Sequence, residues 1–148
     1  MKRDNTEIIK LLFIIHLIAS ITCFIGVFLP YVSVINIDVS LKETFTKKED
    51  YGYLILLIGA PVLGLILSLC RTPDWGILGA VTLVVERMST KELWDGYDSI
   101  STEASAFEKL LYRAMIGKEA GYYCIIIGSI AMIISGLAAT VLTSWSKE

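Results

Sequence analysis

The sequence is poor in charged residues, in cysteine and in histidine, and these shortages exclude several classes of protein. Only 19% of its 148 residues are charged, whereas soluble domains carry about 25%. The 13 Lys and Arg residues form neither a cluster nor a basic helix, so we expect no nucleic-acid partner. Three scattered cysteines and a single histidine give no C-x-x-C or Cys/His metal spacing. We therefore expect no metal ion, no other cofactor and no disulfide scaffold.

Hydrophobic residues, in contrast, make up 55% of the chain and are gathered in four long blocks. The blocks cover residues 8–30, 52–70, 75–85 and 121–145. A helix needs about 20 residues to cross about 30 Å of hydrocarbon, so the first, second and fourth blocks are long enough. The pattern is typical of an integral membrane protein, whose apolar surface is covered by lipid. The first block is too long for a cleaved signal peptide, and no small-residue cleavage site follows it.

The third block has a clear helix start but an early end. In "RTPDW", Thr72 can cap a helix, Pro73 suits its first position, and Asp74 favours the positive end of the helix dipole. The apolar run then ends at "VVER" after only about 20 Å of helix. A crossing needs more length, so we expect the helix to continue past the charged pair and to cover residues 73–93.

Four crossings place both chain termini on the same side of the membrane. The short segments on that side hold five basic residues: Lys2, Arg3, Lys10, Arg71 and Lys147. Basic residues in short loops favour the cytoplasmic side. The sequence therefore predicts a multi-pass protein of the cell membrane with both termini in the cytoplasm.

The two outer connections differ in their periodicity. In "INIDVSL", apolar and polar residues alternate with the period of two that is typical of a strand, so we expect a small β-hairpin there. In "STEASAFEKLLYRAMIGKEAGY", apolar residues share one helical stripe, which predicts an amphipathic helix over 101–117 that ends at Gly117. This helix either lies on the membrane surface or packs on the hairpin.

These features predict a mainly α fold with one integral membrane domain over residues 1–148. We expect a four-helix transmembrane bundle with a small extracytoplasmic cap, made of the β-hairpin and the amphipathic helix. The expected helices cover about residues 8–30, 52–70, 73–93 and 120–144, and the outer loops cover 31–51 and 94–119.

Small residues recur along the predicted helices at the spacing that allows close contact between helices in lipid. In the first helix they are either the pair Ala19 and Cys23 or the pair Thr22 and Gly26. In the other helices they are Ala60, Gly64 and Ser68 in the second, Gly76 and Ala80 in the third, and Gly121, Cys124, Gly128, Ala131, Ser135 and Ala138 in the fourth. Such faces serve contacts within the chain, self-association or a protein partner. Membrane lipids are the other expected partners.

The layout resembles that of a known group of proteins. A first helix that ends at Pro30-Tyr31, a β-rich outer loop, re-entry at Gly52-Tyr53 and the block "AGYYCIIIGSIAMIISGLAA" resemble the uncharacterised small four-helix membrane proteins of bacteria and archaea. The layout is also similar to that of claudins. The claudin signature of Trp and paired Cys is missing from loop 31–51, so a junction-forming role is not implied. The prokaryotic proteins imply no activity either.

Glu86 and Arg87 are the first candidates for a functional site, because ionisable groups at membrane depth are costly. A structural interpretation is that Arg87 reaches outward while Glu86 pairs with Arg87, with Lys118 or with a polar wall. If Lys10 and Thr72 mark the same inner level, then Glu86 and Thr22 both lie about 20 Å across, and Ser129 reaches a similar level. We therefore expect Glu86 to face the interior of the helices near Thr22 and Ser129.

His16, the only histidine, is the second candidate. It lies about 9 Å beyond Lys10 along the first helix and about 10 Å from the level of Glu86, which is too far for a direct proton relay between them. Its neutral ring can hydrogen-bond a carbonyl or a hydroxyl, so it either packs in the interior or handles a proton or ligand. The sequence contains no Ser/His/Asp motif and no phosphate-binding Gly loop, so we expect no enzyme.

Two functions remain open from the sequence, and a third, an enzyme or lipid-modifying protein, would need a polar cavity that converges on Glu86 or His16. The first is a non-enzymatic membrane protein that acts through its extracytoplasmic cap, as an accessory or assembly subunit, an immunity-like factor or a sensor. The alternative is a subunit of an oligomeric ion channel or pore, with Glu86 near the outer mouth as a selectivity charge. The orientation of Glu86 distinguishes the two, because a channel needs it on an axis shared between chains.

Overall fold

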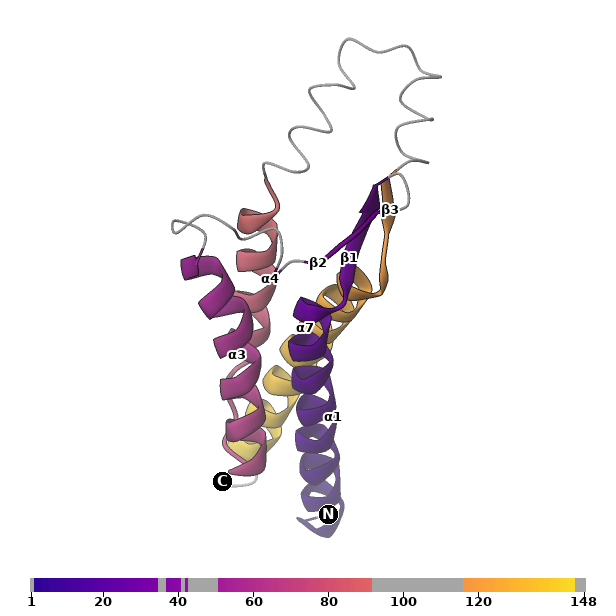
Figure 1. Ribbon diagram of the computed structural model, residues 1–148. Coiled ribbons are helices and arrows are strands. Elements are labelled where there is room, and N and C mark those ends of the chain that lie inside the picture. Colours follow the sequence, from indigo (N-terminus) through magenta and orange to yellow (C-terminus); the bar gives the residue numbers. More distant parts are fainter. Residues whose placement is uncertain (1, 35–36, 41, 43–50, 92–115, 146–148) are drawn as a thin grey trace, which may run out of the picture.

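The computed structural model of the chain describes residues 2–34, 37–40, 42, 51–91 and 116–145 (Figure 1). In these residues the fold is mainly helical, with a small antiparallel sheet. The elements in chain order are α1 (Lys2–Phe28), β1 (Pro30–Val34), β2 (Ile37–Ser40), α3 (Tyr51–Leu69), α4 (Ile77–Ser89), β3 (Ile116–Lys118) and α7 (Ala120–Trp145). The predicted amphipathic helix over 101–117 lies outside the described residues except for its last two positions.

Three of the described helices are long and apolar enough to cross a membrane. They are the stretch Asn5–Phe28 of α1, the whole of α3 and the whole of α7. Helix α4 has 13 residues and is therefore only about 20 Å long. The prediction of a membrane protein is thus supported by length and composition in three helices, and α4 is the exception.

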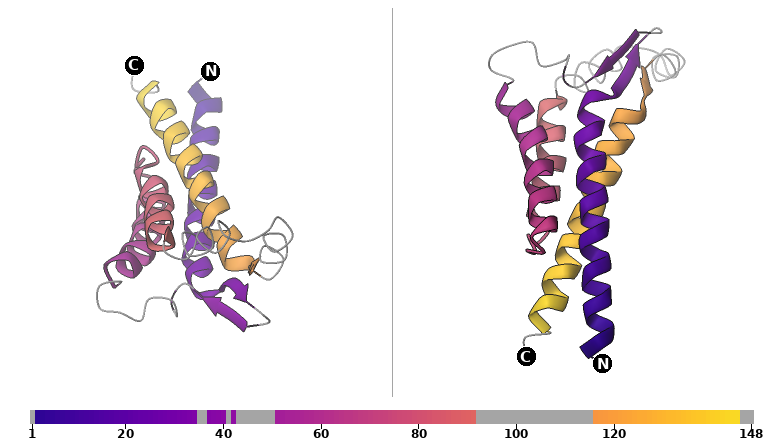
Figure 2. Two further views of the ribbon diagram at one scale, coloured as in Figure 1. Left: turned by 90° about the horizontal axis from the view of Figure 1, so that it is seen from above. Right: turned by 60° about the horizontal axis from the view of Figure 1, so that its bottom comes forward.

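The helices contact one another in a closed cycle, in which α1 packs on α3 and α7, and α4 also packs on α3 and α7. Both chain termini lie at one end of the molecule, and the sheet lies at the other (Figures 1 and 2). The turn between α3 and α4 ends well short of the level of the two termini (Figure 2, right). Helices α1 and α7 therefore extend beyond the α3–α4 pair on the terminal side.

Small residues let α1 and α7 approach closely, as the sequence predicts. A methyl group added at Gly128 would lie 2.6 Å from the Sγ of Cys23 and 3.0 Å from the carbonyl oxygen of Ala19. On α3, the small residues Ala60, Gly64 and Ser68 are all buried. In lipid, where apolar burial gives little drive for association, such close packing holds helices together.

Helix α4 begins at Ile77, whereas the sequence predicted a start at Pro73. Trp75 and Gly76 both have left-handed backbone conformations, with φ of 59° and 72°, and these cannot continue a helix. The Gly76 backbone N–H donates to the carboxylate Oδ1 of Asp74 at 3.0 Å. Asp74 thus lies beside the positive helix end, while Thr72 and Pro73 stay outside the helix.

This later start also changes which face of α4 meets α7. Gly76 is not helical, so its spacing to Ala80 does not define a helix face, and Ala80 is exposed. Within the helix, Gly79 makes the close contact, because a methyl group added there would lie 2.6 Å from the carbonyl oxygen of Ser129. Gly76 also lies against α7, since a methyl group there would lie 2.7 Å from the carbonyl oxygen of Ile133. The predicted contact is therefore correct for Gly76 and wrong for Ala80.

The sheet has three antiparallel strands in the order β2-β1-β3. Strands β1 and β2 form the predicted hairpin, whereas β3 was not expected. Gly117 lies in β3, paired with Ser33 of β1, and does not end a helix. Strand β1 follows α1 after one residue, and β3 precedes α7 by one residue. The sheet is therefore a direct extension of α1 and α7.

Candidate functional site

Two buried polar contacts join the elements of the fold, one near the sheet and one near the α3–α4 turn. The first connects Tyr31 of β1 with Glu86 of α4. The Tyr31 hydroxyl donates a hydrogen bond to Oε1 of Glu86. Glu86 is fully buried and Tyr31 is 1% exposed. Within the described part of the chain, the other carboxylate oxygen, Oε2, has no hydrogen-bond partner.

Apolar side chains surround this outer contact and exclude solvent from it. Tyr31 packs in a cluster with Val27 of α1, Leu57 of α3, Val85 of α4 and Ile125 of α7, so every described helix contributes to it. Burial raises the pKa of the Tyr31 hydroxyl far above its usual value, and the hydrogen bond to Glu86 raises the pKa further. Tyr31 is therefore a stable hydrogen-bond donor.

The orientation expected for Glu86 is correct, but its expected neighbours are wrong. Glu86 faces the interior as predicted. However, the Thr22 hydroxyl donates to the carbonyl oxygen of Ile18 at 2.8 Å, and Ser129 lies against the Sγ of Cys23 at 3.7 Å. Thr22 and Ser129 do share a level, while Glu86 reaches beyond both to the sheet.

The error comes from the assumed depth of the α3–α4 turn. Thr72 lines the same pocket as His16, so the turn lies about six residues, or about 9 Å, beyond Lys10 along α1. Helix α4 is shifted toward the sheet by that amount. Glu86 consequently meets Tyr31, which follows the end of α1, and not the middle of that helix.

The two basic candidates lie outside this contact. Arg87 is exposed on α4, in agreement with an outward-reaching side chain. The Lys118 ammonium group lies 4.7 Å from the ring centre of Tyr122 and 3.4 Å from its hydroxyl. Neither residue makes an ion pair with Glu86 in the described part of the structure. Glu86 instead accepts from the phenol of Tyr31, and the buried Thr90 hydroxyl lies beside it and donates to its backbone carbonyl at 2.7 Å.

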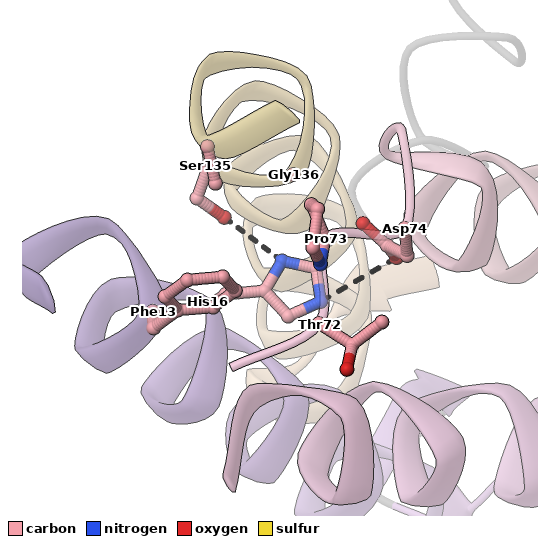
Figure 3. A pocket seen from close by; sticks show the side chains of 8 residues that line it. Phe13, His16, Thr72, Pro73, Asp74, Ser135 and Gly136 are labelled. Carbon is pink, nitrogen blue, oxygen red and sulfur yellow. Dashed lines mark hydrogen bonds and ion pairs between the residues drawn. The ribbon is translucent and has the colours of Figure 1, made fainter. Parts of the chain in front are cut away.

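The second polar contact gathers His16 of α1, Asp74 of the α3–α4 turn and Ser135 of α7 (Figure 3). The imidazole lies between the other two side chains. Its Nδ1 is 3.0 Å from the Ser135 Oγ, and its Nε2 is 3.5 Å from the Asp74 Oδ2. His16 is 4% exposed, and the Asp74 side chain is 5% exposed. These buried groups connect three elements that are far apart in the sequence.

These side chains line a small pocket at the terminal side of the molecule. Phe13, Pro73, Gly136 and Ala139 form its apolar walls, and Thr72 lies at its edge. The pocket has no space for a water molecule. Within the described residues, Nε2 of His16 and Oδ2 of Asp74 have no hydrogen-bond partner and face each other.

The series Ser135–His16–Asp74 has the residue types of a nucleophilic triad, but its serine is not accessible. The Ser135 hydroxyl lies within hydrogen-bonding distance of both the Ala131 carbonyl oxygen, at 2.6 Å, and the His16 Nδ1, at 3.0 Å. A nucleophilic serine must in addition reach its substrate. Ser135 is 1% exposed, so a substrate has no access to it. The contact does not have the geometry of acyl-transfer chemistry.

Local backbone geometry brings Asp74 to the histidine. The left-handed turn at Trp75 and Gly76 redirects the chain, and the Trp75 backbone N–H donates to the Thr140 Oγ1 at 3.2 Å. Gly136 leaves space for the turn, because a methyl group there would lie 2.6 Å from the Gly76 nitrogen. Sequence reasoning assigned Asp74 only to the helix dipole and missed this contact, as it missed the partner of Glu86.

No cluster of three or more potential metal-binding side chains occurs among the described residues. Comparison of the chain with protein-family models, with characterised proteins and with solved structures finds no match. The resemblance in layout to small prokaryotic four-helix membrane proteins and to claudins therefore stays a prediction, and the candidate site stands on its own geometry.

Proposed function

We propose that this chain is a non-enzymatic integral membrane protein that acts through its outer cap, as an assembly, immunity-like or sensing subunit. The buried hydrogen bond between Tyr31 and Glu86 is the observation that carries the proposal. It fastens the sheet to α4, while the chain itself joins the sheet to α1 and α7. A ligand or protein on the sheet thereby acts directly on the membrane helices.

The proposal includes a four-helix bundle with both termini in the cytoplasm. The location of both termini at one end supports it, because α4 then serves as the fourth pass (Figure 1). The exposed apolar side chains of α1 extend from Ile8 to Phe28, a rise of about 30 Å that matches the hydrocarbon thickness. The sheet then lies outside the cell membrane, where a partner can reach it.

The use of small residues also supports the cap as the partner surface. The space beside Gly128 and Gly26 is occupied by atoms of the facing helix, in the contact between α1 and α7 of the same chain. Lipid-facing positions carry large apolar side chains such as Ile55, Leu63 and Ile134. Polar recognition is better suited to the sheet, where Asp38 of β2 is exposed.

Site-specific photo-crosslinking in native membranes tests this proposal. A photoreactive amino acid replaces the exposed Asp38 of β2, and a matched control replaces Leu63, which is 52% exposed on α3. We expect a discrete protein or ligand adduct from position 38 and only lipid adducts from position 63. Tyr31→Phe should weaken the first adduct by loosening the sheet. Equal protein adducts from both positions, or none from position 38, would contradict a cap function.

An oligomeric ion channel remains the alternative, and one observation bears on it. Glu86 is buried within a single chain and bound by Tyr31, so a channel role would require this contact to open. Ion flux into liposomes, measured for the wild type and for Glu86→Gln, tests the alternative. Flux in the wild type that changes selectivity in the variant would favour the channel over the cap proposal.

A further inference from the structure

We infer that the α3–α4 turn and the lipid-facing side of α4 form a binding site for an anionic phospholipid of the inner leaflet. The phosphate binds Arg71, and one acyl chain lies along α4. Three features converge on this site: the depth of the turn, the exposed arginine and an apolar hollow that starts beside the turn. Such a site requires only the membrane placement of the helices included in the proposed function, and it is independent of any partner of the cap.

The α3–α4 turn lies deeper in the membrane than the ends of α1 and α7. Thr72 lines the same pocket as His16, and the turn ends well short of the level of the chain termini (Figure 2, right). Exposed apolar side chains of α1 continue past this level as far as Ile8, which is about 12 Å from His16 along the helix. A flat inner leaflet that covers this part of α1 would therefore place hydrocarbon around the turn.

The turn satisfies its own backbone at this depth but exposes a charge. Helix α3 ends in a Schellman motif, in which the Arg71 N–H donates to the Ser68 carbonyl oxygen at 3.1 Å and the Thr72 N–H donates to the Leu67 carbonyl oxygen at 2.9 Å. Arg71 takes the left-handed conformation of this motif, with φ of 53°, and is exposed. An arginine among acyl chains is costly unless an anion accompanies it. A lipid phosphate is the anion that the membrane itself supplies, and guanidinium binds it in a bidentate manner.

The groups around Arg71 leave its charge to the phosphate. Asp74, the carboxylate of the same turn, has a side chain that is 5% exposed and faces His16. In the described part of the chain, Arg71 makes no ion pair. Thr72 is exposed, and its hydroxyl can donate to the same phosphate. Trp75 is 60% exposed, and tryptophan is typical of the head-group level. The turn thus carries residues of a membrane surface inside the apolar length of α1.

An apolar hollow of about 330 Å³ on α4 continues from the turn. This volume is at the lower end of the range for small-molecule sites, roughly 300–1,000 Å³. The hollow is lined by apolar residues of α4: Ile77, Ala80, Val81, Val84 and Val85. Gly79 and Thr82 are buried on the opposite side of the helix, so the hollow faces the lipid. Because Ile77 directly follows the turn, an acyl chain in the hollow begins beside Trp75.

An anionic phospholipid is the occupant that suits both parts of the site. An apolar helix of a second chain would fill the hollow but leave Arg71 without an anion. Free phosphate would bind the arginine but leave the hollow empty. A phospholipid joins the two chemistries in one molecule, and basic sites on the cytoplasmic side of membrane helices favour anionic head groups.

Quenching of tryptophan fluorescence by brominated lipids tests the site. The chain has three tryptophans, and Trp94→Phe with Trp145→Phe leaves Trp75 as the only reporter. The full chain is placed in vesicles of phosphatidylcholine and phosphatidylglycerol, in which only one of the two lipids carries bromine on its acyl chains. We expect phosphatidylglycerol to bind beside Trp75 about fivefold more strongly than phosphatidylcholine, the effect of one basic residue at a membrane surface.

Three variants in this background separate the two parts of the site. Arg71→Gln should abolish the preference for phosphatidylglycerol, whereas Arg87→Gln, a change at the other exposed arginine next to α4, should keep it. Ala80→Phe fills the hollow from an exposed position and should lower the preference as well.

Equal quenching by the two lipids with Arg71 intact would overturn the inference, because the arginine would then reach water and not a lipid phosphate. Equal losses in Arg71→Gln and Arg87→Gln would also overturn it, since they would assign the preference to surface charge in general. A full preference in Ala80→Phe would contradict the placement of the acyl chain on α4.

Discussion

The two ends of this molecule bury a carboxyl group in different ways. Near the sheet, Glu86 accepts a hydrogen bond from the neutral phenol of Tyr31, inside an apolar cluster to which all four described helices contribute. At the terminal side, Asp74 faces the imidazole of His16 in a small pocket beside the α3–α4 turn. The first contact joins a strand to a helix, and the second joins a turn to two helices.

The two contacts also differ in the number of elements that they join. The Tyr31 phenol donates at any pH below its raised pKa, so the hydrogen bond between the sheet and α4 persists over the physiological range. The inner contact instead brings together an imidazole of α1, a carboxylate of the α3–α4 turn and a hydroxyl of α7.

Tyr31→Phe should have the largest effect on stability. The substitution removes the phenol that donates to the buried Glu86, and the loss of a hydrogen bond to a buried carboxyl group costs about 3 kcal/mol of the free energy of unfolding. Equilibrium unfolding in mixed detergent micelles measures the loss. Arg87→Gln changes the exposed neighbour of Glu86 and serves as the control, with an expected change within about 0.5 kcal/mol.

A double substitution checks the cause of that loss. Tyr31→Phe combined with Glu86→Leu replaces both polar partners with apolar groups, which is often nearly neutral in a protein interior. The double variant should therefore be more stable than Tyr31→Phe alone. A loss equal to the sum of the two single changes would show that shape, and not the hydrogen bond, holds the sheet to α4.

Two glycine substitutions should destabilise one end each by about 2 kcal/mol. A methyl group at Gly121 would lie 2.7 Å from the carbonyl oxygens of Leu29 and Pro30, and one at Gly136 would lie 2.6 Å from the Gly76 nitrogen. Backbone atoms cannot rotate away from these contacts. Gly59→Ala is the control, because a methyl group there meets nothing within 4 Å.

The same two variants also test whether the ends are independent. Gly136→Ala should alter the ¹⁵N signals of His16, because it displaces the turn that carries Asp74, whereas Gly121→Ala should leave them unchanged. Unfolding measurements and NMR spectra of the same samples provide both results. Equal changes at His16 in the two variants would mean that the ends are coupled through α7.

Ser135→Ala should have a smaller effect, a loss of about 1 kcal/mol of the free energy of unfolding. It removes the hydroxyl that lies 3.0 Å from Nδ1 of His16 while leaving the imidazole and Asp74 in place. Ser144→Ala is a matched control on the same helix, because the Ser144 hydroxyl makes the same type of bond to a carbonyl one turn earlier, that of Thr140, and is exposed. Equal losses in both variants would assign the effect of Ser135 to its helix bond alone.

The sequence predicts the helices better than their relative shift along the axis. Apolar length locates three helices, and the close approach at Gly128 follows from the spacing of small residues. The start of α4 could not be predicted, because it depends on a left-handed backbone conformation at Trp75. Residues other than glycine rarely adopt this conformation. That turn shifts α4 toward the sheet by about 9 Å, and this shift decides the neighbours of Glu86.

The candidate residues show the same limit. His16 and Glu86 could be selected from the sequence because they are rare ionisable groups in apolar segments. Their partners could not, because Tyr31, Asp74 and Ser135 each have an ordinary local explanation, as an interfacial aromatic, a helix-end carboxylate and a small packing residue. Which residues pair across the fold depends on how far each helix is shifted along its axis relative to its neighbours. The periodicity within one helix contains no information on this shift.

The smallest expected effect is the absence of a change, and it concerns the outer contact. Tyrosines ionise near pH 10 in unfolded chains, whereas burial holds the pKa of Tyr31 well above that value. A group with a raised pKa in the folded state stabilises the fold below its unfolded pKa, and this contribution is lost as the pH rises further. Ultraviolet absorbance of the folded wild type and of Tyr31→Phe should therefore show the same phenolate signal up to about pH 10.5. An additional tyrosine titrating in the wild type near pH 10 would mean that solvent reaches Tyr31 and that the outer contact is not closed by the apolar cluster around it.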